Sequence, residues 1–140
     1  MHPTSIEPFT ARSGATLTEP FAQPDEADAL PLVITQCERF LAREVHSEQF
    51  DVQASIPRST LDAAARVGLF GLSLPEESGG LGFSLKSTCH VIQCLARVDR
   101  AIAITVGLHA GLGTRGLVRF GADELKRAWL PLLASGEAIA

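Results

Sequence analysis

The glycine spacing of "GLGTRG", residues 111–116, constrains the fold of this chain more than any other feature. Glycines in the order G-x-G-x-x-G are typical of a dinucleotide-binding turn, which needs a strand before it, a helix after it and then a second parallel strand that ends in an acid. After Gly116 the chain instead meets Gly121 and Pro131 before it reaches Glu137, and this stretch contains no β-branched run. We therefore predict that residues 111–116 lie inside a helix and that the fold is all-α, with no sheet.

Apolar residues recur at spacings of three and four along the chain after residue 30, which is the period of amphipathic helices. Aromatic residues make up only 6% of a chain that is 46% hydrophobic, so the core must consist mainly of aliphatic side chains. The sequence predicts a bundle of about five to six helices. Their expected spans are 31–45, 57–67, 85–96, 100–119 and a last helix that opens at Asp123 and Glu124.

Several helix ends carry residues that suit them. Pro31 fits a first helical turn, and Ser84 and Asp99 can cap the helices that follow them. Gly68 and Gly121 can end the helices that precede them. These five residues support the predicted boundaries.

The same spacing predicts which residues of each helix face the core. In the first helix they are Val33, Ile34, Cys37, Phe40, Leu41 and Val45, and in the second Leu61, Ala64 and Val67. In the helix 85–96 they are Leu85, Cys89, Ile92, Leu95 and Ala96. In the last helix they are Leu125, Trp129, Leu132 and Leu133, and Pro131 should kink or split that helix.

Two segments are expected to lack regular structure. Residues 1–28 hold four of the eight prolines and no apolar period, so we predict a disordered, acidic leader before a helical domain of residues 29–140. Residues 69–84 contain Pro75 and four glycines, which predicts a shaped loop. The Gly79, Gly80 and Gly82 cluster in that loop indicates a tight turn, with a phosphate cradle as the alternative.

The charge pattern argues against nucleic acid as a partner. The net charge is −4, and five acids in residues 1–30 face a single arginine, so the remaining residues hold eleven acids and eleven bases. No basic stripe is present to attract phosphates. The stretch between Arg100 and Arg115 is too short for a membrane span, and no secretory or mitochondrial signal is visible, so we expect a cytoplasmic location.

Cysteines and histidines do not form a recognisable metal site. The three cysteines lack C-x-x-C spacing, and the four histidines are scattered, so we predict no metal and reduced, buried thiols. His109 is expected to be a hydrogen-bonded structural residue. Ser73 lacks the flanking glycines of a nucleophile elbow, and the adjacent acids Glu76 and Glu77 are expected to be solvated, so we predict no catalytic residue in the chain.

A stripe of small residues follows one side of the predicted helix 100–119. Glycine costs up to about 1 kcal/mol in a helix interior relative to alanine, so several together indicate a spatial reason. Close helix packing and the wall of a cavity are both consistent with the stripe. Its members are Ala103, Gly107, Ala110, Gly111 and Thr114.

Three motifs in order resemble the N-terminal α-helical domain of acyl-CoA dehydrogenases. They are "GLFGLSLPEESGGLGFS" followed by a helix ending in "LARVD", then "GLHAGLG" in a small-residue helix, and then "FGADELKRAWLPLLASGEAIA". The resemblance covers about residues 32–140. It implies one part of a three-part, FAD-dependent flavoprotein that oxidises acyl-CoA to 2-enoyl-CoA.

In that family the first domain contributes part of the acyl pocket, while most of the FAD site and the catalytic glutamate lie in later domains. The resemblance therefore implies no catalytic and no cofactor-binding residue here, and no activity of the 140-residue chain alone. It implies acyl-CoA as substrate, the remaining domains or a partner chain as partners, and a homo-oligomer. The implied acyl-facing residues, for which core packing is the alternative, are Ile104, Thr105, Leu108 and Leu112.

Two other functions stay open from the sequence. A fold-related flavin-dependent monooxygenase would share this first domain, since the distinguishing residues lie downstream. A self-standing helical module would keep the fold and bind a partner through an uncovered face.

Overall fold

The computed structural model describes residues 24–140, which are helical and contain no strand. Residues 1–23 of the predicted leader lie outside this part of the chain. The α-helices are α1 (Pro24–Glu44), α2 (Ser47–Gln53), α3 (Arg58–Arg66), α4 (Leu85–Ala96), α5 (Arg100–Leu108), α6 (Thr114–Phe120) and α7 (Asp123–Ser135). A 3-10 turn, η1 (Glu76–Ser78), and a π-helical segment, η2 (His109–Gly113), complete the order. The predicted all-α fold is confirmed.

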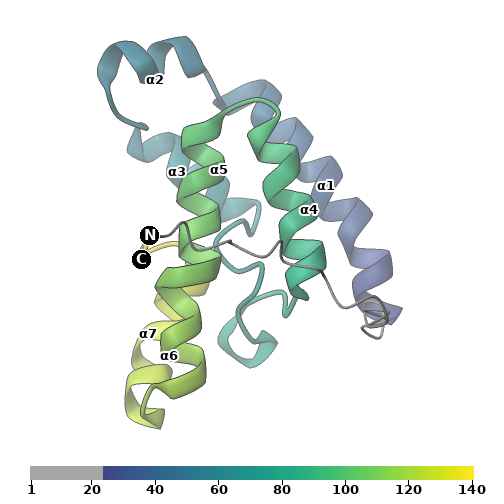
Figure 1. The fold of residues 1–140 in the computed structure, drawn as a ribbon, viewed down its shortest axis with the longest axis vertical. Helices are drawn as coiled ribbons and strands as arrows, with labels where there is room; N and C mark the ends of the chain where they lie inside the picture. The colour runs from purple at the N-terminus through teal and green to yellow at the C-terminus, as the bar shows by residue number, and fades with distance from the viewer. Residues whose placement is uncertain (1–23) are drawn as a thin grey trace, which may run out of the picture.

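The helices α1, α4 and α5 lie side by side in one half of the molecule. Figure 1 shows α4 between α1 and α5, and the contacts join α4 to both neighbours. α5 continues through η2 into α6 as one helix from Arg100 to Phe120, and α7 packs against α6 in the lower half of the view. Gly111, Gly113 and Gly116 all lie within this helix, so the dinucleotide interpretation is excluded.

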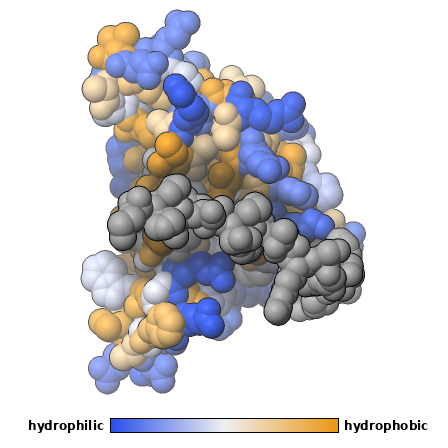
Figure 2. Space-filling model, viewed as in Figure 1, coloured by the Kyte–Doolittle hydropathy of each residue, from blue (hydrophilic) through white to orange (hydrophobic). Residues whose placement is uncertain are grey.

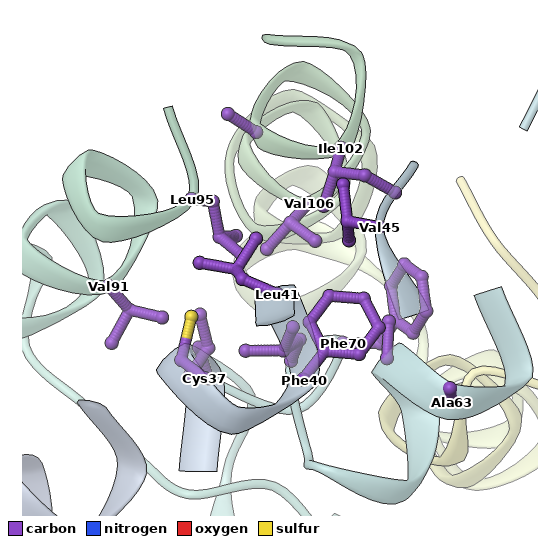
Figure 3. Close-up of a cluster of buried hydrophobic side chains, with 14 of the residues drawn as sticks. Cys37, Phe40, Leu41, Val45, Ala63, Phe70, Val91, Leu95, Ile102 and Val106 are labelled. Atoms are coloured by element: carbon purple, nitrogen blue, oxygen red, sulfur yellow. The ribbon is translucent and has the colours of Figure 1, made fainter. Parts of the chain in front are cut away.

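The main hydrophobic core lies where α1, α4 and α5 meet. Figure 3 shows its side chains converging from these helices and from the segment that carries Phe70. Fully buried members include Cys37, Leu95 and Phe70, and Ile102 and Val106 enter from α5. Burying an aliphatic side chain of this size contributes roughly 1.5–3 kcal/mol, so this cluster is the main source of stability.

The predicted loop 69–84 is one of the most buried parts of the molecule. Leu69, Phe70, Leu72 and Leu74 are each 0% exposed. Backbone hydrogen bonds fold the loop onto itself, and one joins the Leu81 N–H to the Gly71 carbonyl at 2.8 Å. A side chain at position 80 would place its Cβ 2.1 Å from the Leu74 carbonyl oxygen, so only glycine permits this close approach.

Four of the predicted helix boundaries are confirmed. The Asp99 carboxylate accepts a hydrogen bond from the Ile102 N–H at 2.9 Å, and the Ser84 hydroxyl accepts one from the Ser87 N–H. Gly68 adopts φ 84° after α3, and Gly121 follows the last residue of α6. Capping therefore operates where the residue types suggested it.

The first helix and the one after it differ from the prediction. α1 begins at Pro24, not near residue 31, so residues 24–28 of the predicted leader are helical and Pro31 lies inside the helix. Pro24 takes the first helical position, which suits the fixed φ of proline. The short helix α2 was not predicted, because its seven residues include a single buried side chain, Phe50.

The predicted inward face of α4 is wrong in part. Leu95 is buried and Ile92 packs against the core as expected, but Cys89 is exposed, so its thiol is not buried as predicted. The buried side is Ser87, Thr88, Val91 and Leu95, whereas Leu85 is 64% exposed. The expectation matched apolar residue types, but two hydroxyl residues lie on the buried side.

The predicted face of α7 is wrong in part. Leu133 is buried as expected, but Leu125 and Trp129 are about half exposed. The buried residues form a second, smaller cluster with Leu74 from the loop: Leu130, Leu133 and Ala134. α7 runs unbroken through Pro131, so the predicted split is wrong and a kink stays a prediction.

The Arg100–Phe120 helix is long enough and apolar enough to cross a membrane by length and composition, with 21 residues and a mean hydropathy of 1.3. The sequence expectation counted only the residues between Arg100 and Arg115. A third of its most apolar stretch is buried inside the molecule, and the core helix of a soluble protein can have the same length and composition. Ile102 and Val106 of this helix lie in the main core.

Candidate functional site

An exposed apolar strip runs along one side of α5 and into η2. We define it as the four residues that were predicted to face an acyl chain: Ile104, Thr105, Leu108 and Leu112. Three of these side chains are large and apolar: Ile104 is 58% exposed, Leu108 50% and Leu112 85%. Thr105 is half-buried, and its hydroxyl donates to the Ala101 carbonyl at 2.8 Å. Within residues 24–140 the strip is therefore exposed apolar surface and not part of the core.

The π-helical segment η2 widens the helix at the end of the strip. The Ala110 carbonyl accepts a hydrogen bond from the Ser73 hydroxyl at 2.9 Å and a longer one, 3.5 Å, from the Thr114 hydroxyl. Side chains thus satisfy a carbonyl in the widened turn. Single π turns of this kind occur frequently at functional sites.

His109 lies on the buried side of η2 and is 0% exposed. Its Nδ1 accepts the Ala140 N–H at 3.1 Å, and its ring meets the Phe70 ring edge-on with 5.1 Å between centroids. Nε2 forms no hydrogen bond of good geometry within residues 24–140. Burial lowers the pKa of His109, while the carbonyl groups of Phe70 and Leu133 act in the opposite direction. The ring is buried and hydrogen-bonded, as expected from its place in an apolar helix.

A cavity of about 450 Å³ lies between α4 and the α5–α6 helix. Gly107, Ala110, Gly111 and Thr114 line one side of it, so four of the five predicted small residues form a cavity wall. The fifth, Ala103, is buried in the main core. Close packing therefore explains Ala103, and the wall of a cavity explains the other four small residues.

Polar groups enter the same cavity from both sides. Thr88 of α4 is 2% exposed, and its Oγ1 has no hydrogen-bond partner within the described residues. Arg115 and Arg119 of α6 line the cavity beyond Thr114. None of these three residues was singled out from the sequence.

The glycine cluster of the loop does not offer a phosphate site. The Gly79, Gly80 and Gly82 N–H groups donate to the carbonyls of Glu76, Pro75 and Leu74, at 2.9–3.0 Å. Because the amides are already paired, the turn interpretation is confirmed. Among residues 24–140, no group of three or more His, Cys, Asp or Glu side chains could hold a metal ion.

Comparison with known proteins decides the family. The model of the acyl-CoA dehydrogenase N-terminal domain matches residues 29–137. The chain belongs to the acyl-CoA dehydrogenase family. The resemblance inferred from the loop and helix motifs is confirmed.

Relatives in this family are named as dehydrogenases. The very long-chain specific acyl-CoA dehydrogenase of Macaca fascicularis is 29% identical over 116 residues, which cover 83% of this chain and 18% of that protein. The Probable acyl-CoA dehydrogenase FadE25 of Mycobacterium tuberculosis is 37% identical over 123 residues, 86% of this chain and 30% of that protein. The chain therefore spans less than a third of these relatives.

A solved acyl-CoA dehydrogenase from Bacillus anthracis, complexed with FAD, has the same fold. The TM-score is 0.71 at 34% sequence identity, and the match covers 85% of this chain and 21% of that one. The helical bundle is thus the N-terminal domain architecture of the acyl-CoA dehydrogenase family.

Sequence reasoning found the strip of this acyl-CoA dehydrogenase domain but missed the polar side of the cavity. Arg115 and Arg119 follow the small-residue stripe at a spacing of four, which was the available signal for a charged end. Thr88 had no comparable signal, because a threonine in a helix does not reveal whether its hydroxyl is paired.

Proposed function

We propose that this domain forms one wall of the acyl-binding site in an FAD-dependent enzyme that oxidises acyl-CoA to 2-enoyl-CoA. The observation that carries the proposal is the exposed apolar strip on a helix of the family's N-terminal domain. An acyl chain laid along Ile104, Leu108 and Leu112 would remove these side chains from water, a favourable transfer.

The glycine-rich loop leaves no free amides at Gly79, Gly80 and Gly82 for the phosphates of FAD, because these N–H groups are used within the turn. We therefore assign FAD, which accepts the hydride in this reaction, mainly to domains beyond this chain. The contribution of this domain is to bind and orient the acyl chain and to exclude water from it, and we expect no turnover from the 140-residue chain alone.

Partners and location follow from the same proposal. We infer acyl-CoA as the substrate, the remaining dehydrogenase domains as the cover of the apolar strip, assembly as a homo-oligomer and a cytoplasmic location. No observation on the described residues favours a flavin-dependent monooxygenase or a self-standing module, and the relatives named above are acyl-CoA dehydrogenases.

A domain exchange tests the proposal. Residues 29–137 would replace the matching segment of the Bacillus anthracis enzyme, and FAD content and acyl-CoA oxidation would be measured. We expect the chimera to retain FAD and activity. A folded chimera without FAD would contradict the assignment of this domain.

Two matched substitutions in the chimera then test the strip. Leu108 and Leu125 are 50% and 51% exposed, but only Leu108 belongs to the strip. We expect Leu108→Asp to raise the KM for a long acyl-CoA by about tenfold or more, from the loss of apolar contact, with FAD content unchanged. Leu125→Asp should leave KM near its starting value. Equal effects of the two changes would show that the strip does not face the acyl chain.

A further inference from the structure

The cavity between α4 and the α5–α6 helix has the dimensions of a ligand site. Its volume of about 450 Å³ falls within the range of roughly 300–1,000 Å³ that is common for small-molecule pockets. It is separate from the apolar strip, because none of the strip residues lines it. The acyl-chain proposal therefore does not account for it.

One part of the cavity is apolar and narrow. Phe83 of the loop and Ile92 of α4 line it opposite Gly107 and Ala110. A Cβ at position 107 would meet Ile92 at 3.6 Å, whereas a Cβ at position 111 would meet no atom within 4 Å. The space beside Gly111 is thus open, and it suits an aliphatic chain.

The other part of the cavity is positively charged. Arg115 and Arg119 lie one helical turn apart on α6, and neither guanidinium forms an ion pair within residues 24–140. Gly107 and Arg119 are twelve residues apart along the helix, which is about 18 Å at the helical rise of 1.5 Å per residue. The cavity therefore runs from an apolar end to a cationic end.

Thr88 is an independent sign of a missing polar partner. Its hydroxyl is buried, lines the cavity and forms no hydrogen bond with the described residues. A buried polar group without a partner costs about 1–3 kcal/mol, and a ligand oxygen in the cavity would remove that cost. The hydroxyl is a donor that a carboxylate or a neighbouring oxygen can use.

We propose that this cavity binds an aliphatic carboxylate. The carboxylate lies between Arg115 and Arg119, whose planar guanidinium groups match its geometry. The chain extends past Gly111 toward Gly107 and Ile92, and Thr88 donates a hydrogen bond to one of the two carboxylate oxygens. The site is distinct from the proposed acyl-CoA wall, so either can be wrong while the other holds.

Titration of the 140-residue chain with octanoate tests the proposal, with calorimetry as the readout and octanamide as the uncharged analogue. We expect octanamide to bind at least about tenfold more weakly, because it cannot form charge-assisted hydrogen bonds with the arginines. Equal binding of the two compounds would overturn the proposal.

Variants locate the ligand within the cavity. The double change Arg115→Gln and Arg119→Gln should weaken octanoate binding about tenfold or more, and Thr88→Val about threefold. Gly111→Leu should abolish binding, because the side chain fills the open space beside the helix. Arg127→Gln, on the exposed face of α7, is the matched charge control and should have no effect.

Two further measurements keep the result unambiguous. If Gly111→Leu loses helix content by circular dichroism, Gly111→Ala and the double arginine variant decide, since neither introduces a large group. Leu125→Ser, at an exposed position of α7 outside both the strip and the cavity, should leave octanoate affinity unchanged. Retention of full affinity in the double arginine variant would show that octanoate binds elsewhere.

Discussion

The two apolar sides of the Arg100–Phe120 helix differ in surroundings rather than in composition. Ile102 and Val106 are 1% exposed in the main core, whereas Ile104 and Leu108 are 58% and 50% exposed on the strip. Figure 2 shows in the same view as Figure 1 that apolar residues also reach the surface of the molecule, among polar ones. Apolar spacing thus identifies both sides of the helix, but only the neighbouring elements decide which side is covered.

The contrast predicts very different costs for the same substitution on the two sides. Ile102→Ala should lower the free energy of unfolding by about 3 kcal/mol, because it leaves a cavity in a close-packed core. Ile104→Ala should change it by less than about 0.5 kcal/mol, since the side chain is largely in water. Urea denaturation of both variants measures the difference. Similar losses would mean that the strip is also packed in solution.

The buried side should also make stability depend on pH. Burial lowers the pKa of His109, so the unfolded chain binds a proton more readily than the folded one. Stability should therefore fall as pH drops below the ordinary histidine value near 6.5, by at most about 1.4 kcal/mol per pH unit, and level off below the lowered folded-state pKa. Thermal denaturation between pH 7.5 and about pH 5 measures this slope.

A matched pair of variants tests whether His109 causes this pH dependence of stability. His109→Gln should flatten the pH dependence, while His90→Gln, at an exposed position of α4, should keep it. The unsubstituted chain and His90→Gln should therefore show parallel curves. A slope that survives in His109→Gln would place the responsible group elsewhere.

The π-helical segment η2 predicts a smaller effect on the free energy of unfolding. Ser73→Ala removes the hydroxyl that donates to the Ala110 carbonyl in the π-helical segment, and it should cost about 1 kcal/mol of stability. Ser135→Ala, at an exposed hydroxyl near the end of α7, should cost less. Denaturation curves of the two variants, with backbone amide exchange at residues 109–114, measure the change. Unchanged exchange in Ser73→Ala would show that the widened turn does not depend on this bond.

The strip predicts the smallest effect on stability and a clear one on association. Leu108→Ser and Leu112→Ser together should change the free energy of unfolding by less than about 0.5 kcal/mol, because both side chains are already exposed. They should reduce self-association in sedimentation and the binding of an apolar dye, since exposed apolar patches drive both. A monodisperse starting chain with no dye binding would remove the need for a covering domain.

Much of the fold was predictable because it depends on local chemistry. Spacings of three and four placed the helices, and Asp99, Ser84, Gly68 and Gly121 marked ends that the structure confirms. The "GLGTRG" segment was correctly placed in a helix, since no second strand could follow it. Caps, turns and helical periodicity act within a few residues, so they can be recognised from the sequence alone.

Side-chain surroundings could not be predicted in the same way. Thr88 has no hydrogen-bond partner in the described structure, and the inward face of α4 differs from the apolar pattern, because both depend on how α4 packs against α1 and α5. The cavity arises from the same packing, which places Thr88 across from Gly111 and Arg115.

The amino-acid sequence by itself determined the helical class, the shaped glycine-rich loop and the family of this chain, because each is encoded in short, contiguous patterns. Only the tertiary structure decided which apolar side of the Arg100–Phe120 helix is core and which is open, and that small residues of this helix wall a cavity. The physical reason is that burial and hydrogen-bond pairing are set by residues far apart in the chain, whose positions are defined only when the helices pack together.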